Sequence, residues 1–71
     1  MQQNFDVVVE RDQDGFYVAS VPALPGCHTQ AKSLDELNRR ILEAIQLCLE
    51  EDGAPEEHLE FVGIQRVTIA A

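Results

Sequence analysis

Tryptophan is absent from this sequence of 71 residues, and basic residues are few, with five lysines and arginines against 13 acidic residues. The formal net charge is −8. Binding to a phosphate backbone draws on clustered Lys and Arg, so a chain this acidic is predicted to have no meaningful affinity for DNA or RNA at physiological salt. Its basic residues are scattered, at Arg11, Lys32, Arg39, Arg40 and Arg66.

Cysteines and long apolar runs are also scarce. Cys27 and Cys48 are the two cysteines, and they lack the dense spacing of a disulfide framework, which favours a reducing compartment. No apolar run approaches the ~20 residues of a membrane span, and the first residues lack the basic and apolar regions of a signal peptide. We therefore expect a cytoplasmic protein without a membrane segment.

The length predicts one domain over residues 1–71. A domain of this size buries only about 60% of its unfolded surface, so a partner or self-association would add needed stability.

Residues 15–27 are the most distinctive stretch. Residues 16–21 alternate as in a sheet strand, and Pro22 stops the strand because it has no N–H. Pro25 and Gly26 then supply a fixed φ followed by a position free to take positive φ, as a tight turn requires. We assign structural roles to Gly15, Pro22, Pro25 and Gly26.

The remaining elements follow from periodicity and turn chemistry. Residues 5–11 alternate as a first strand, residues 12–15 form a turn, and residues 27–30 form a third strand. Ser33 and Glu36 have the spacing of a capping box, which predicts a helix that begins at Leu34 and stops at Gly53. Residues 61–69 have strand character again.

Four strands and one helix predict an α+β fold of the form β-β-β-α-β. A strand that rejoins the sheet through a helix favours a parallel crossover, which places the fourth strand beside the first in the order 3-2-1-4, a truncated ribonuclease H-like sheet. One helix covers one face only. On the other face we expect an oligomer interface, formed by Val8, Tyr17, Ala19 and either Val62 with Ile64 or Val67 with Ile69, with Leu47 as a further exposed apolar residue.

Enzyme chemistry is not favoured. Cys27 and His28 are adjacent on a strand and point to opposite faces, which opposes a catalytic dyad. Zinc-ligand spacings are lacking among Cys27, His28, Cys48 and His58. Asp6 and Glu10 share one face of the first strand, but other acids are not expected to converge on them for two-metal catalysis. We predict no catalytic residue, metal or cofactor; a small metal- or thiol-dependent enzyme is the least favoured alternative.

The run over residues 15–27, with its Pro22, Leu24, Pro25, Gly26 and Cys27, resembles the corresponding run of the HicB-like antitoxin family. The similarity extends over about residues 5–50 and implies the same sheet topology. It implies a binding module that occludes a small, basic, mRNA-cleaving toxin of the HicA type. The alternative is a stand-alone homo-oligomer that has lost the toxin.

An acidic chain suits such a basic partner, because complementary charge speeds association. We expect the acidic residues Glu50, Glu51, Glu56 and Glu57 to attract the toxin. Affinity is expected from apolar and aromatic anchors at Tyr17, Leu24 and His28.

Overall fold

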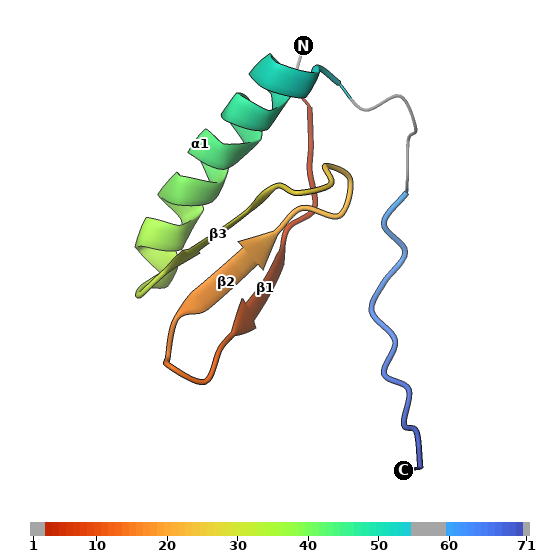
Figure 1. Ribbon diagram of the computed structural model, residues 1–71. Coiled ribbons are helices and arrows are strands. Elements are labelled where there is room, and N and C mark those ends of the chain that lie inside the picture. The colour runs from red at the N-terminus through yellow and green to blue at the C-terminus, as the bar shows by residue number, and fades with distance from the viewer. Residues whose placement is uncertain (1–2, 55–59, 71) are drawn as a thin grey trace.

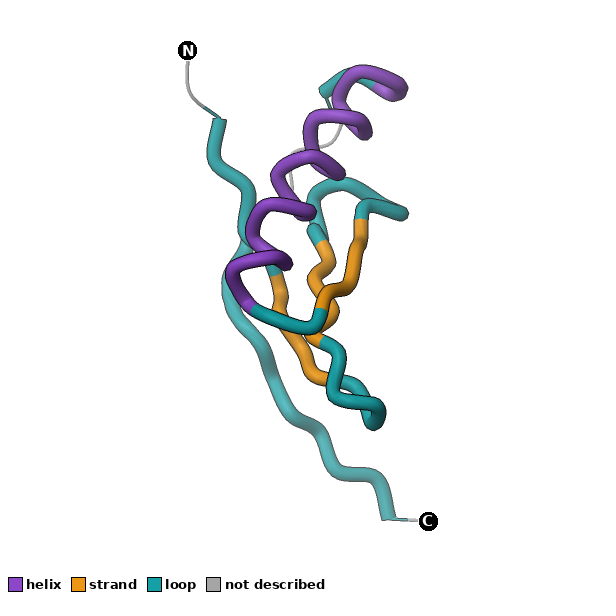
Figure 2. The backbone as a smooth tube through the Cα atoms, turned by 90° about the vertical axis from the view of Figure 1, so that its left-hand side faces the viewer, coloured by secondary structure: helices purple, strands orange, loops and turns teal. Residues whose placement is uncertain are grey.

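A computed structural model describes residues 3–54 and 60–70 of the chain (Figure 1). Three strands, β1 (Val8–Arg11), β2 (Tyr17–Ser20) and β3 (His28–Ala31), form an antiparallel sheet in the order β1-β2-β3. One helix, α1 (Leu34–Asp52), lies across one face of this sheet as a second layer (Figure 2). The predicted α+β class and the first four elements are confirmed.

The turn between β1 and β2 is held by Asp12. Its carboxylate Oδ1 accepts hydrogen bonds from the backbone N–H groups of Asp14 and Phe16, both at 2.9 Å. Gly15 has φ +88°, a conformation that a residue with a β-carbon rarely adopts. The predicted turn chemistry is therefore present.

The connection between β2 and β3 is a rigid corner of two successive turns. Leu24 N–H donates to the Val21 carbonyl and Cys27 N–H donates to the Leu24 carbonyl, each at 3.0 Å. Val21 N–H closes the corner by donating to the Cys27 carbonyl, also at 3.0 Å. Gly26 has φ +83°, as the third position of a type II turn after Pro25 requires.

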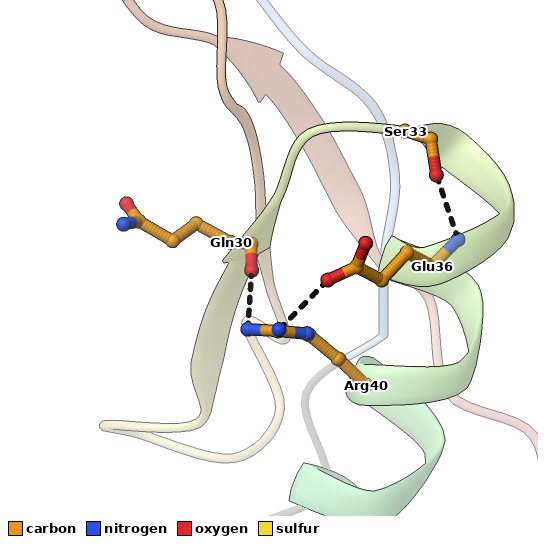
Figure 3. Close-up of polar contacts among 4 residues, drawn as sticks. All are labelled: Gln30, Ser33, Glu36 and Arg40. Atoms are coloured by element: carbon orange, nitrogen blue, oxygen red, sulfur yellow. Dashed lines mark hydrogen bonds and ion pairs between the residues drawn. The ribbon is translucent and has the colours of Figure 1, made fainter.

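The helix begins and ends where the sequence predicts. The Ser33 hydroxyl caps it by accepting from the backbone N–H of Glu36 at 3.2 Å, and Gly53, at φ +73°, ends it. Only half of the capping box forms, because the Glu36 carboxylate pairs with Arg40 at 2.7 Å (Figure 3). The other end of the Arg40 guanidinium donates to the Gln30 carbonyl at 3.3 Å, which links α1 to β3.

The core between the layers is small and built largely from small side chains. Ala19 is 0% exposed and Ala31 is 3% exposed on the covered face of the sheet. Among the described residues, the buried core consists of Ala19, Val21, Leu24, Cys27, Ala31, Leu37 and Ile41. Short side chains let the helix approach the strands closely, and they also limit how much apolar area the domain buries.

The face assignment of β2 requires a correction. Tyr17 and Ala19 pair with Ala31 and Thr29 of β3 and pack with the core, so they lie on the face that α1 covers. Both were predicted to lie on the uncovered face, and that prediction is wrong. The alternation was right, but the helix selects the side with the two alanines.

Residues 60–70, which we call the arm, do not form the predicted fourth strand. They carry no regular structure, and the sheet has three strands within the described residues. Figure 1 shows the arm (blue) extended in the same direction as β1 and clear of the sheet. The radius of gyration of 13.8 Å exceeds the about 11 Å expected for a compact domain of this length. The order 3-2-1-4 and the ribonuclease H-like sheet are not confirmed.

Candidate partner-binding surfaces

The face of the sheet that α1 leaves uncovered, here called the open face, carries alternate residues of all three strands. The cross-strand register places Val8, Ser20 and His28 in one row and Glu10, Val18 and Gln30 in the next. Two valines among polar side chains make this face less apolar than predicted from the sequence. It is suited to a partner that offers hydrogen bonds and charge as well as apolar contact.

The proline corner borders the open face. A hollow of about 480 Å³ lies there, lined by residues that include Val18, Pro22, Pro25 and His28. His28 is exposed, and its Nδ1 lies 3.0 Å from the Gly26 carbonyl, which orients the ring beside the hollow. His28 is therefore available to a partner.

Leu24 is not available in the same way. It is 6% exposed and belongs to the core, since both turns of the corner direct it inward. The expectation that Leu24 anchors a partner is corrected: it holds the corner together.

Tyr17 lies on the covered face, at the end of the central strand β2 that is farther from the proline corner. Its ring is half-buried against the core, and the Arg11 guanidinium lies 5.5 Å from the ring centroid. This arrangement leaves part of the ring accessible, but on the helix side and not on the open face. Tyr17 and His28 are thus not brought together on one surface.

Acidic residues gather at the carboxyl end of α1. Glu50, Glu51 and Asp52 are exposed there, and the last turn of α1 contains no basic residue. Negative charge at a helix carboxyl end opposes the helix dipole and costs about 0.3–1 kcal/mol per group. These acids therefore do not serve the stability of the helix. Glu56 and Glu57 lie outside the described residues.

Exposed apolar side chains lie mostly on α1 and on the arm. Leu47 is exposed, as expected, and so are Leu34 and Leu42. The exposure of Leu42 was not predicted from the sequence. The signal was present, since the apolar positions of this helix span a wider arc than one buried face needs.

The two cysteines are free thiols that face each other across the layers. Burial raises the pKa of the Cys27 thiol to about 11, and its hydrogen bond and charge interaction with Cys48 act in the same direction. A thiol with this pKa is protonated at neutral pH and is not a nucleophile. The burial of Cys27 therefore does not favour this thiol as a nucleophile.

Metal-ligand groupings of three or more His, Cys, Asp or Glu side chains do not occur within residues 3–54 and 60–70. Within the same ranges, no helix has the length and apolar character needed to cross a membrane.

Comparison with known proteins identifies the family to which the chain belongs. The model of the HicB-like antitoxins of bacterial toxin–antitoxin systems matches residues 5–64. The chain belongs to this family, as its residues 15–27 predicted.

Relatives of similar length carry the name UPF0150 protein. One from Archaeoglobus fulgidus is 57% identical over 70 residues, which cover 92% of this chain and 93% of the relative. One from Synechocystis is 47% identical over 68 residues, covering 96% and 97%. One from Thermotoga maritima is 36% identical over 66 residues, covering 92% and 88%.

Proposed function

We propose that this protein neutralises a small, basic, mRNA-cleaving toxin of the HicA type by binding and occluding it. Membership of the HicB-like antitoxin family is the observation that carries the proposal. The net charge of −8 supports it, because a surface that handles RNA is basic and meets an acidic partner with complementary potential. The proposed role is inhibition by contact and involves no catalysis, cofactor or nucleic acid ligand.

In the proposed contact, different residues set the association rate and the dissociation rate. Glu50 and Glu51, with Glu56 and Glu57, raise the association rate, since rim charges steer encounter more than they hold a complex. His28, and the accessible part of Tyr17, supply contact area that slows dissociation. A cytoplasmic location is part of the proposal, because both cysteines are free thiols and mRNA is cleaved there.

A direct test uses purified protein and the HicA-type toxin encoded in the same cell. A molar excess of this protein is expected to abolish cleavage of a defined RNA by the toxin. Cleavage that continues unchanged would remove the antitoxin proposal.

A kinetic test locates the charge contribution. Replacing Glu50, Glu51, Glu56 and Glu57 with Gln is expected to slow association and to flatten its salt dependence. The matched control removes four acids elsewhere, by Asp6→Asn, Asp14→Asn, Asp35→Asn and Glu43→Gln. Equal slowing by both sets would show that net charge acts and that the acidic end of α1 has no particular role.

His28→Ala is expected to speed dissociation with little change in the association rate.

Self-association of the chain is a second proposed property, and it is compatible with toxin binding. Its support is the number of exposed apolar side chains in a small domain, among them Leu47 and Val62. The predicted interface residue Val8 lies half-buried on the open face, whereas Ala19 is fully buried under α1 and is not carried forward.

A further inference from the structure

The outer edge of β1 is open. β1 pairs with β2 on one side, and among the described residues no strand pairs with it on the other. Such an edge presents free backbone N–H and C=O groups to any strand that arrives.

The helix leaves room above that edge. α1 packs over β3 and β2 and not over β1. Two hollows of about 370 and 380 Å³ result between α1 and the chain at and before β1. Their apolar lining comes from both layers and includes Val7, Val9, Leu34, Ile41, Leu42 and Ile45. A strand added to β1 would lie beneath these side chains and cover them.

The arm has the character of such a strand but contacts little of its own molecule. Val62 is 92% exposed and Ile69 is 83% exposed, whereas Phe61, at the base of the arm, is 45% exposed. The arm is therefore held at its base and free beyond it.

The apolar side chains of the arm lie on both of its faces. In an extended chain Val62 and Ile64 point to one side, and Val67 and Ile69 point to the other. Strands that are apolar on both faces are typical of sheets covered on both sides. The part of one copy that the structure describes contains one helix, which covers one side of the sheet only.

The position of the arm base favours pairing of the arm with a second copy of the chain over pairing with its own molecule. Residues 60–64 line a pocket of about 540 Å³ together with Val8, Pro22 and Ala23. Val8 belongs to the open face, so the arm leaves its own molecule on the side opposite the hollows under α1. The arm's own molecule thus leaves these hollows uncovered.

We propose that the arm pairs with the open edge of β1 in a second copy of the chain, so that two copies exchange arms reciprocally. One apolar pair of the arm then contacts the hollows beneath the partner's helix. The other pair, Val62 and Ile64, lies on the side of the open face, at the pocket that residues 60–64 form with Val8, Pro22 and Ala23. The inference rests on the self-association proposed above and is independent of toxin neutralisation.

Light scattering coupled to gel filtration tests the exchange. The unmodified chain is expected to elute with twice its mass of 7.9 kDa. The double variant Val67→Asp/Ile69→Asp is expected to elute as a single chain, because one apolar pair loses its burial. Thr68→Asp/Ala70→Asp adds the same charge to the same segment on the opposite side of the extended arm, and it is expected to retain the double mass. The four positions are exposed, so loss of folding does not confuse the result.

Isotope-filtered NMR on an equal mixture of labelled and unlabelled chains provides the second measurement. Methyl contacts between Ile69 or Val67 and the Val9 and Leu42 side chains are expected between different chains. The same contacts found only within one chain would show closure of the arm on its own molecule and overturn the exchange.

The remaining outcomes separate the two proposals. A double mass that survives Val67→Asp/Ile69→Asp overturns arm exchange and leaves self-association standing. A mass of 7.9 kDa for the unmodified chain overturns both, while suppression of RNA cleavage still decides toxin neutralisation independently.

Discussion

The folded body, residues 3–54, and the arm, residues 60–70, are both rich in apolar residues, yet only the body buries them. In the body, each strand is joined to the next by a turn with its own chemistry, at Asp12 and at Pro25–Gly26, and Ser33 starts the helix. The arm carries Phe61, Val62 and Ile64 in exposed positions, and among the described residues it pairs with no strand. Apolar character alone therefore does not fix a strand.

The largest contrast is expected from truncating one isoleucine in each region. Ile41 is buried under the layers, so Ile41→Ala is expected to lower the free energy of unfolding by about 2–5 kcal/mol. Ile64 is exposed, so Ile64→Ala is expected to change the free energy of unfolding by less than about 0.5 kcal/mol. This value applies to the folded body at protein concentrations low enough for the chain to be a monomer. Urea denaturation followed by helix circular dichroism measures both. Similar losses would mean that the arm is part of the core.

A pair of glycines sharpens the comparison. Gly26 holds a positive φ, and a β-carbon there would meet no atom, so Gly26→Ala isolates the backbone cost of about 1–2 kcal/mol. Gly63 in the arm has equal space and no such φ, and Gly63→Ala is expected to leave the melting temperature unchanged. Scanning calorimetry at matched concentration measures both variants. An unchanged melting temperature for Gly26→Ala would show that the positive φ at this corner does not contribute to stability.

A third difference concerns the interior of the body at high pH. The pKa of the Cys27 thiol rises from 9.0 to about 11 on folding, so the unfolded chain loses this proton first. Stability is then complete below pH 9.0 and falls by about 1 kcal/mol per pH unit up to about pH 11. Stability measured across this range for the native chain and for Cys27→Ala should show the extra slope only in the former. Parallel slopes would place the thiol in water.

The smallest expected effect concerns the link between layers. Glu36→Gln removes the ion pair with Arg40, which is partly exposed, so the loss should be no more than about 0.5 kcal/mol. Glu43→Gln, on the exposed side of the same helix, is the control. Because salt screens exposed pairs, the difference between the two variants should vanish in about 1 M salt. A difference that persists would indicate that Arg40 holds β3 mainly through Glu36.

The sequence predicted the body well because its signals are local. The helix ends at Gly53, as predicted, and the turn at Gly15 follows from residues 12–15 alone. The burial of Leu24 was not predictable from the same stretch, since it depends on how two turns stack. To predict on which face of the sheet Ala19 lies, one must know which face the helix covers. The fourth strand failed because pairing over a long separation depends on what covers β1, which the periodicity of residues 61–69 does not report.

The arrangement of contacts in the body also has a consequence for the order of folding. β1 pairs with β2, β2 with β3, and α1 packs on the strands that immediately precede it. Contacts between neighbours in sequence close small loops, and proteins built from them fold rapidly. The body is therefore expected to form in a fast step whose rate is independent of protein concentration. Pairing of the arm with a second copy would follow as a slower step whose rate rises with the amount of chain present, so a cell's expression level would set how long the β1 edge stays open.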